Sequence, residues 1–425
     1  MALAVDTAMV GRVPDGDVAL TGMGYATQLV FLLMVAMIGL TIGTVAFLAR
    51  AHGAGHVERV QHILHQSSQL TILLGLFVAL AGNLFAGPLI DLLGADAPSA
   101  EAGLAYLRPL LLGTAFNYLN ILYAAALRGV GNTRLAFAVA LFMNLLNVVL
   151  NYGLILGNYG LPALGLTGAA IGTVVSQALA AGLMFLLLRR GAVPGVTLSA
   201  RPAAIDWGLA RDLNRIGWPA AADMVVLNAA FIAIIGMIAR IDQAAVAAHG
   251  VGIRIQALAF VPGMSISQAT SAMVGNALGA GSVTAAKAVV RSSLVLCTLV
   301  MSGLALAIVG LAEPIVGLFG IERGSAVFDY SVQWLRILGY GMPVVGVYVA
   351  FIGMLRGAGE TMVGLRINTW VTLALQIPAS YVLGFSLGLS AWGVWAAFPA
   401  TFIVKAGWAW RVYRSGRWAK VGAST

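Results

Sequence analysis

Charged side chains are scarce in this chain. Of its 425 residues, only 9% are Asp, Glu, Lys or Arg, and 60% are hydrophobic. A soluble globular domain usually carries about 25% charged residues. So few charges cannot cover a surface that faces water. The composition therefore excludes an ordinary soluble protein and indicates one that is embedded in lipid.

Cysteine and the common catalytic motifs are also scarce. The single cysteine, Cys297, cannot form a disulfide within the chain and is expected to be a small buried apolar side chain. No glycine-rich loop ending in Lys–Ser or Lys–Thr is present, which argues against ATP-driven transport. The histidines between His52 and His65 have only Glu58 as a neighbouring acid, so a solvated loop is favoured over a metal site. We therefore expect no enzyme activity, no cofactor and no metal.

Long apolar runs dominate what remains. A membrane-spanning helix needs roughly 20 apolar residues, and β-barrel strands would instead alternate over about 10 residues. Runs of the helical kind cover residues 18–50, 64–87, 103–127, 135–157, 163–188, 217–239, 245–277, 289–312, 328–355, 365–386 and 389–412, and an incomplete one covers residues 1–13. The sequence thus predicts an all-α polytopic membrane protein with 12 helices, the first of them truncated.

The net charge of +9 has a topological explanation. If the first helix leaves the cytoplasm, most Lys and Arg residues fall on one side of the membrane, in loops such as 189–216 and in the tail after residue 412. An excess of basic residues marks the cytoplasmic side. We therefore expect a lipid bilayer, and no nucleic acid, as the partner of this basic chain.

Two halves of the chain repeat one plan. Tyr106–Leu107–Arg108 recurs as Trp334–Leu335–Arg336, and Leu127–Arg128–Gly129 recurs as Leu355–Arg356–Gly357, both at a spacing of 228 residues. These landmarks predict two pseudo-symmetric six-helix lobes of like orientation, a plan in which the substrate passes between the halves. The predicted parts are an N-terminal lobe, a cytoplasmic linker whose second part forms a short amphipathic helix or is solvated, a C-terminal lobe and a cytoplasmic tail, at residues 1–188, 189–216, 217–412 and 413–425.

Several short motifs resemble one transporter family over nearly the whole chain. They are the stretch Asp6–Arg12, Gly53–Gly55, the two Leu–Arg–Gly turns, Asn147–Asn151, Gly165–Ala170 and Gly217–Pro219. This set resembles the multidrug and toxic compound extrusion (MATE) family, and within it the DNA-damage-inducible F (DinF)-like branch. Relatives begin the first helix well before the Asp6 motif, so either the start site is assigned too late or the chain works with half a helix.

The resemblance implies a secondary active antiporter that exports small amphipathic, often cationic, organic substrates in exchange for cations. It also implies a multi-pass protein of the plasma (inner) membrane, monomeric, with both termini of the full-length family form in the cytoplasm. Many members of the DinF-like branch are thought to be coupled to protons. Asn151 stands where many relatives carry a second acid.

Comparing the two halves at the shared spacing suggests a cation-handling site in the first. Asp6 corresponds to Ile234, and polar residues of the N-terminal lobe often correspond to apolar ones. The predicted proton or cation coupling residues are Asp6, Asn117, Asn120, Asn144, Asn147, Asn151 and Thr173. Asn144, Asn147 and Asn151 share one helix face. Membrane asparagines also serve as interhelical contacts worth only about 0.6 kcal/mol, and Thr173 could equally bond its own backbone.

Asp6 is the most informative of these residues. A carboxylate in a bilayer costs at least about 2.5–3.5 kcal/mol and is normally functional or paired. Removal from water favours its protonated form, so it is suited to carry a proton. The alternative is that Asp6 lies at the interface and caps a turn.

A substrate cavity is predicted from long side chains in both lobes, namely Gln28, Met34, Met37, Arg254, Gln256 and Met264. Methionine gives an adaptable apolar wall, although plain packing accounts for it as well. Gln28 and Gln256 could face each other across the path, and Arg254 could line the cavity or pair with an acid. Asp223 is expected near the cytoplasmic end of its helix, with its side chain snorkelling to the interface.

The leading hypothesis is export of organic cations in exchange for protons. Sodium-coupled relatives carry acids deep in the seventh and tenth helices, where this chain has Leu227 and Asn228 and no acid from Tyr340 to Leu355. Sodium coupling through Asp223 remains one alternative. A lipid-linked oligosaccharide flippase of the same superfamily is another, although only Arg254 is available as a cavity arginine. A membrane-embedded enzyme or a passive channel would need clustered or repeated charges that the predicted spans lack.

Overall fold

The computed structural model describes residues 6, 7, 9–11, 16–199 and 201–420. Among them the regular structure is helical, apart from one isolated bridge between Val193 and Val196. Asp6 and its neighbours Thr7, Met9 and Val10 are helical. Ala8 and Arg12 of the first motif, and most of the predicted truncated segment, lie outside the described residues.

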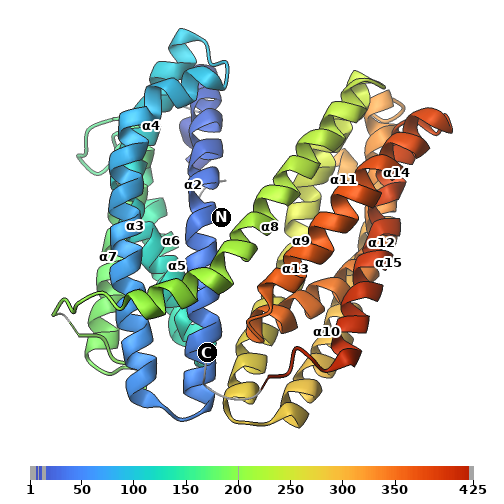
Figure 1. Cartoon of the computed structure of the whole chain (residues 1–425). Helices are drawn as coiled ribbons and strands as arrows, with labels where there is room; N and C mark the ends of the chain where they lie inside the picture. The colour runs from blue at the N-terminus through green and yellow to red at the C-terminus, as the bar shows by residue number, and fades with distance from the viewer. Residues whose placement is uncertain (1–5, 8, 12–15, 200, 421–425) are drawn as a thin grey trace. The chain divides into compact units, whose positions relative to one another are not determined.

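The chain forms two compact units (Figure 1). Unit 1 comprises Met1–His52 and His56–Arg215, and unit 2 comprises Gly53–Gly55 and Ile216–Thr425. The helices of unit 1 are α2 (Gly16–Gly53), α3 (Val57–Leu92), α4 (Ala97–Leu112), α5 (Thr114–Gly129), α6 (Thr133–Leu156) and α7 (Gly165–Arg189), and α8 (Trp207–Ala239) begins there and continues into unit 2. Unit 2 also contains α9 (Gln243–Gly279), α10 (Val283–Gly310), α11 (Ala312–Gly317), α12 (Ala326–Gly357), α13 (Thr361–Val371), η1 (Thr372–Gln376), α14 (Ile377–Tyr381), η2 (Val382–Ser386) and α15 (Ser390–Ser415).

Within the described residues, eight helices are long and apolar enough to span a membrane, and nine if the bent pair α4 and α5 is one span. The all-α polytopic fold is confirmed. The helix predicted at residues 103–127 divides into α4 and α5, which meet at an angle of 56°. Gly113 lies at the bend, and a Cβ there would lie 2.5 Å from a methyl carbon of Val174. The close approach of α7 therefore requires glycine at the bend.

The segment predicted as one helix at residues 365–386 is interrupted. It divides into α13, the π-helical turn η1, α14 and the π-helical turn η2. Pro378 lacks an N–H and its ring crowds the carbonyl four residues earlier, which disfavours an uninterrupted α-helix. π-helical turns are often found at functional positions.

The second part of the predicted linker merges with the seventh helix into α8. Asp206 caps this helix by accepting a hydrogen bond from the Leu209 N–H at 3.0 Å, and it also contacts His62 of α3 at 3.0 Å. The Leu209 N–H and then His62 hold the pKa of the Asp206 carboxyl below its usual range. Gln66 of α3 donates to the Ala204 carbonyl and accepts from the Asp206 N–H. The linker is therefore packed on α3 rather than free in solvent.

Candidate functional site

The carboxyl group of Asp6 is buried inside unit 1, with 3% of the residue exposed. The Asn151 side chain on α6 donates a hydrogen bond from Nδ2 to Asp6 Oδ1 at 2.6 Å. Gly172 of α7 makes room for this amide, because a Cβ at Gly172 would lie 2.0 Å from Asn151 Oδ1. A glycine on the neighbouring helix thus positions the carboxyl–amide pair.

A second amide extends the polar row along α6. Asn147 donates from Nδ2 to Thr173 Oγ1 on α7 at 3.1 Å. Among the described residues, the side-chain oxygens of both Asn147 and Asn151 are buried and lack a hydrogen-bond partner. Such oxygens are available to accept a proton donor.

A cavity of about 220 Å³ opens beside Asp6. Its walls come from several elements of unit 1, and its lining comprises Asp6, Thr27, Val30, Leu33, Met34, Tyr106, Leu110, Leu111, Thr114, Asn117, Tyr118, Thr173 and Gln177. Asp6 is the one acid among these lining residues. Ligand sites for drug-sized molecules usually measure about 300–1,000 Å³, and a water molecule takes about 30 Å³. In this conformation the cavity therefore suits water and protons better than a bulky substrate.

The predicted coupling residues fall into two groups. Asp6, Asn117 and Thr173 line the cavity, and Asn147 and Asn151 bind directly to two of these residues.

The other two predicted coupling residues make contacts of a structural kind. Asn120 donates to the Phe116 carbonyl of its own helix and to the Gln177 carbonyl of α7, which joins α5 to α7. Asn144 donates to the Ala140 carbonyl within α6.

Of the residues predicted for a substrate cavity, Met34 lines the space beside Asp6. Met37 is fully buried and Gln28 is exposed, both on α2. On α9 of unit 2, Gln256 is buried, whereas Arg254 and Met264 are exposed. Their roles stay predictions.

Unit 2 contains a polar cluster that the sequence comparison missed. We define the unit 2 cluster as Asp223 (α8), Asn368 (α13), Thr372 (η1) and Lys405 (α15). Asn368 Nδ2 donates to Asp223 Oδ1 at 2.7 Å. Lys405 Nζ donates to Asn368 Oδ1 at 2.6 Å and to Thr372 Oγ1 at 2.9 Å. The expectation that Asp223 snorkels to the interface is wrong, because the residue is 8% exposed and bonded inside the unit.

The sequence held a usable indication of this cluster. Asp223 and Lys405 both lie inside predicted spans, and ionisable residues there are normally functional or paired. The comparison at 228 residues pairs Asp6 with Ile234 and Asn151 with Ala379. Asp223 and Asn368 each lie 11 residues before these paired positions, so the 228-residue spacing does not detect them.

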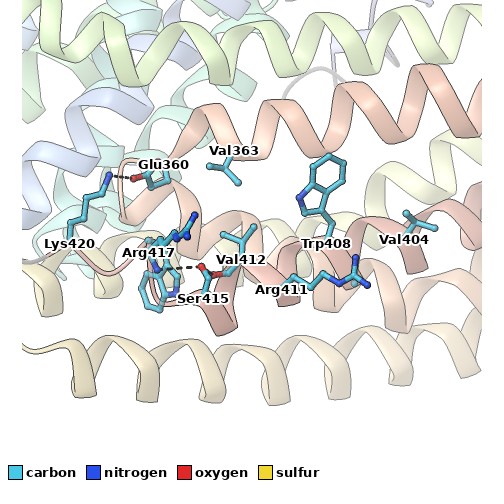
Figure 2. Close-up of a pocket in the computed structure, with 11 residues that line it drawn as sticks. Glu360, Val363, Val404, Trp408, Arg411, Val412, Ser415, Arg417 and Lys420 are labelled. Carbon is cyan, nitrogen blue, oxygen red and sulfur yellow. Dashed lines mark hydrogen bonds and ion pairs between the residues drawn. The ribbon is translucent and has the colours of Figure 1, made fainter.

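A larger cavity of about 1,170 Å³ lies between α13 and α15 of unit 2 (Figure 2). Arg411, Arg417 and Lys420 contribute positive charge to its lining, and Glu360 contributes the one carboxylate. That carboxylate is already paired, since Lys420 Nζ donates to Glu360 Oε1 at 2.8 Å (Figure 2). The described lining of this cavity therefore offers no unpaired acid with which to exchange a cation.

Comparison with known proteins gives a consistent family. The model of the MatE family matches residues 1–153 and 219–382. A probable multidrug resistance protein NorM of Thermotoga maritima is 26% identical over 95% of this chain and 86% of its own length. An FAD transporter of Shewanella oneidensis is 25% identical over 91% of this chain and 84% of its own length.

Solved structures share the fold. A crystal structure of MATE in the bent conformation matches with a TM-score of 0.90 at 21% identity, over 99% of this chain and 92% of that one. An outward-facing multidrug resistance MATE family transporter of the MOP superfamily matches with a TM-score of 0.88 at 22% identity, over 99% and 94%. The DinF-like branch stays a prediction. The chain belongs to the MatE family of multidrug and toxic compound extrusion transporters.

Proposed function

We propose that this chain exports small amphipathic organic cations in exchange for protons, and that Asp6 carries the proton. The observation that carries the proposal is a buried carboxyl group, bonded to one amide, which lines a cavity without a second acid among its described lining residues. A carboxyl group removed from water favours its neutral form. Asp6 is therefore suited to release a proton when a cation or water enters and to regain it afterwards.

The neighbouring amides can serve both charge states of Asp6. The ionised carboxylate accepts the hydrogen bond from Asn151 Nδ2. A protonated carboxyl must donate its own O–H, and the unpartnered oxygens of Asn147 and Asn151 can accept it. On protonation, Asp6 would exchange the N–H donor of Asn151 for an amide oxygen of Asn147 or Asn151. Protonation would then be coupled to the packing of α6 on α7.

Sodium is a poorer match to this cavity. Hard metal cations are held by several oxygen ligands, with carboxylates prominent among them, and the described lining offers a single carboxylate. The single carboxylate also favours cationic substrates, because a cation would compete with the proton for that one negative charge. We place the protein in the inner membrane as a monomer, with its basic loops in the cytoplasm as the charge distribution predicts.

Transport in proteoliposomes tests the proposal. Efflux of a fluorescent organic cation should follow an imposed proton gradient and ignore a sodium gradient at constant pH. Asp6→Asn should abolish the proton-driven component without loss of the folded protein. Asp17→Asn is the matched control, since Asp17 is an exposed acid in the first turn of α2. Transport that follows a sodium gradient, or that survives Asp6→Asn undiminished, contradicts the proposal. A parallel assay with FAD in place of the organic cation tests whether the substrate is an anion.

A further inference from the structure

The two units contain carboxyl–amide pairs built on corresponding helices. Asn151 donates to Asp6 at 2.6 Å and Asn368 donates to Asp223 at 2.7 Å, and in both pairs the partners are 145 residues apart. The second pair follows the first by 217 positions, 11 fewer than the 228 of the sequence repeat. Eleven residues make about three helical turns, or about 16 Å, so the same helix faces are used closer to the start of both helices.

Among the described residues, a lysine contacts the pair in unit 2 and none contacts the pair in unit 1. At the repeat spacing Lys405 corresponds to Gln177, a neutral residue that lines the cavity beside Asp6. Lys405 is 1% exposed. Burial of an ammonium group is very costly unless it is paired and hydrogen-bonded.

The surroundings of Lys405 Nζ are those of a bound monovalent cation. Besides the oxygens of Asn368 and Thr372, the ammonium lies 4.7 Å from the ring centroid of Phe402 and 5.9 Å from that of Tyr348. Aromatic faces at such distances attract cations. Asp223 supplies the negative charge through Asn368.

We propose that the unit 2 cluster is a monovalent-cation site whose occupant is the chain's own Lys405 ammonium. Arg356, partly buried on α12, is a second positive charge that interacts with Asp223, but the ligand oxygens of Asn368 and Thr372 are bound by Lys405. A tethered ammonium occupies the site permanently, so unit 2 needs no sodium ion. This inference is independent of proton transfer at Asp6.

Replacement of the tethered cation by a free one tests the site. Lys405→Ala leaves the oxygen ligands and opens the space of the ammonium. The melting temperature of the purified full chain is measured in methylammonium chloride, sodium chloride and choline chloride at equal concentration. Lys405→Ala should melt below the parent in choline and regain roughly 1–2 °C in methylammonium or sodium at about ten times the Kd. The parent and Lys287→Ala, which alters an exposed lysine of α10, should melt alike in all three salts.

Dependence on Asp223 separates a cation site from a packing effect. The rescue should disappear in the double variant Asp223→Asn with Lys405→Ala. Equal melting of Lys405→Ala in the three salts, or a rescue that persists without the Asp223 charge, overturns the proposal.

A second measurement covers the case in which Lys405→Ala does not fold. Lys405→Met and its combination with Asp223→Asn are compared by size-exclusion chromatography. If Lys405 is the counter-ion of Asp223, Lys405→Met should aggregate, and adding Asp223→Asn should restore the monodisperse peak. Aggregation of both the single and the double variant overturns the proposal. Neither readout requires transport, so failure of the Asp6 proposal leaves this test unaffected.

Discussion

The two carboxyl–amide pairs share their local geometry and differ in charge balance. In unit 1 the Asp6 carboxyl lines a cavity, and the oxygen of its partner Asn151 has no hydrogen-bond partner among the described residues. In unit 2 the oxygen of Asn368 accepts hydrogen bonds from both Lys405 and Thr372. Nearby cations favour the ionised form of a carboxyl group. Asp223 has Arg356 and Lys405 near it, whereas the described residues that line the Asp6 cavity include no cation. The two acids therefore differ in the charge around them, and this difference is the reason why we propose Asp6, rather than Asp223, as the proton carrier.

The largest contrast is expected when the amide of each pair is removed. Asn368→Leu removes the shared partner of Asp223 and Lys405. It therefore loses two hydrogen bonds to charged groups, each worth about 1.5–3 kcal/mol. Asn151→Leu removes one hydrogen bond to a charged group, worth about 1.5–3 kcal/mol, and should mainly reduce transport.

The two leucine variants are compared by thermal melting and by efflux. Asn368→Leu should lower the melting temperature more than Asn151→Leu does, while Asn151→Leu should lose proton-driven efflux in protein that remains folded. Equal destabilisation by both variants would mean that the two pairs play the same structural role.

A smaller effect is expected from the glycine that makes room for the unit 1 pair. A methyl group at Gly172 would lie 2.0 Å from Asn151 Oδ1, and overpacking of this kind costs about 1–3 kcal/mol. Gly172→Ala should therefore lower both stability and efflux. Gly182→Ala on the same helix meets nothing within 4 Å and is the control. If both variants behave like the parent, Asn151 is not held by α7.

The smallest effect is expected at the linker, away from both pairs. The Leu209 N–H and His62 lower the pKa of Asp206 in the folded protein, so its contribution to stability is present above the unfolded pKa, about 3.9. That contribution is lost as the pH falls through the depressed folded value. Asp206→Ala should therefore lower the melting temperature slightly at neutral pH and match the parent in strong acid. A difference that grows on acidification would contradict this assignment.

The sequence predicts the contact between Asp6 and Asn151 but not that between Asp223 and Asn368, for a geometric reason. Asp6 and Asn151 could be proposed together because each is polar where its repeat partner is apolar. Asp223 and Asn368 are not detected by that comparison, because both lie about three helical turns before the positions paired at the 228-residue spacing. A comparison at one fixed spacing cannot detect such a displacement. Asn120 and Asn144 are predicted because the N-terminal lobe concentrates amides on shared helix faces. The bond of Asn120 to the Gln177 carbonyl depends on where α7 lies, whereas Asn144 bonds to the Ala140 carbonyl of its own helix.

The sequence by itself determined that the chain lies in lipid and which family it belongs to. A chain with 9% charged residues must face lipid, and a backbone in lipid must satisfy its hydrogen bonds within helices. Short motifs then identified the family without any coordinates.

Tertiary structure alone decided which polar groups meet. Val174 leaves no room for a side chain at Gly113, and Gly172 makes room for the Asn151 amide. Lys405 bonds to Asn368, which precedes it by 37 residues. Side-chain hydrogen bonds require distances of about 3 Å, and such distances between residues far apart in sequence are set by how the helices pack.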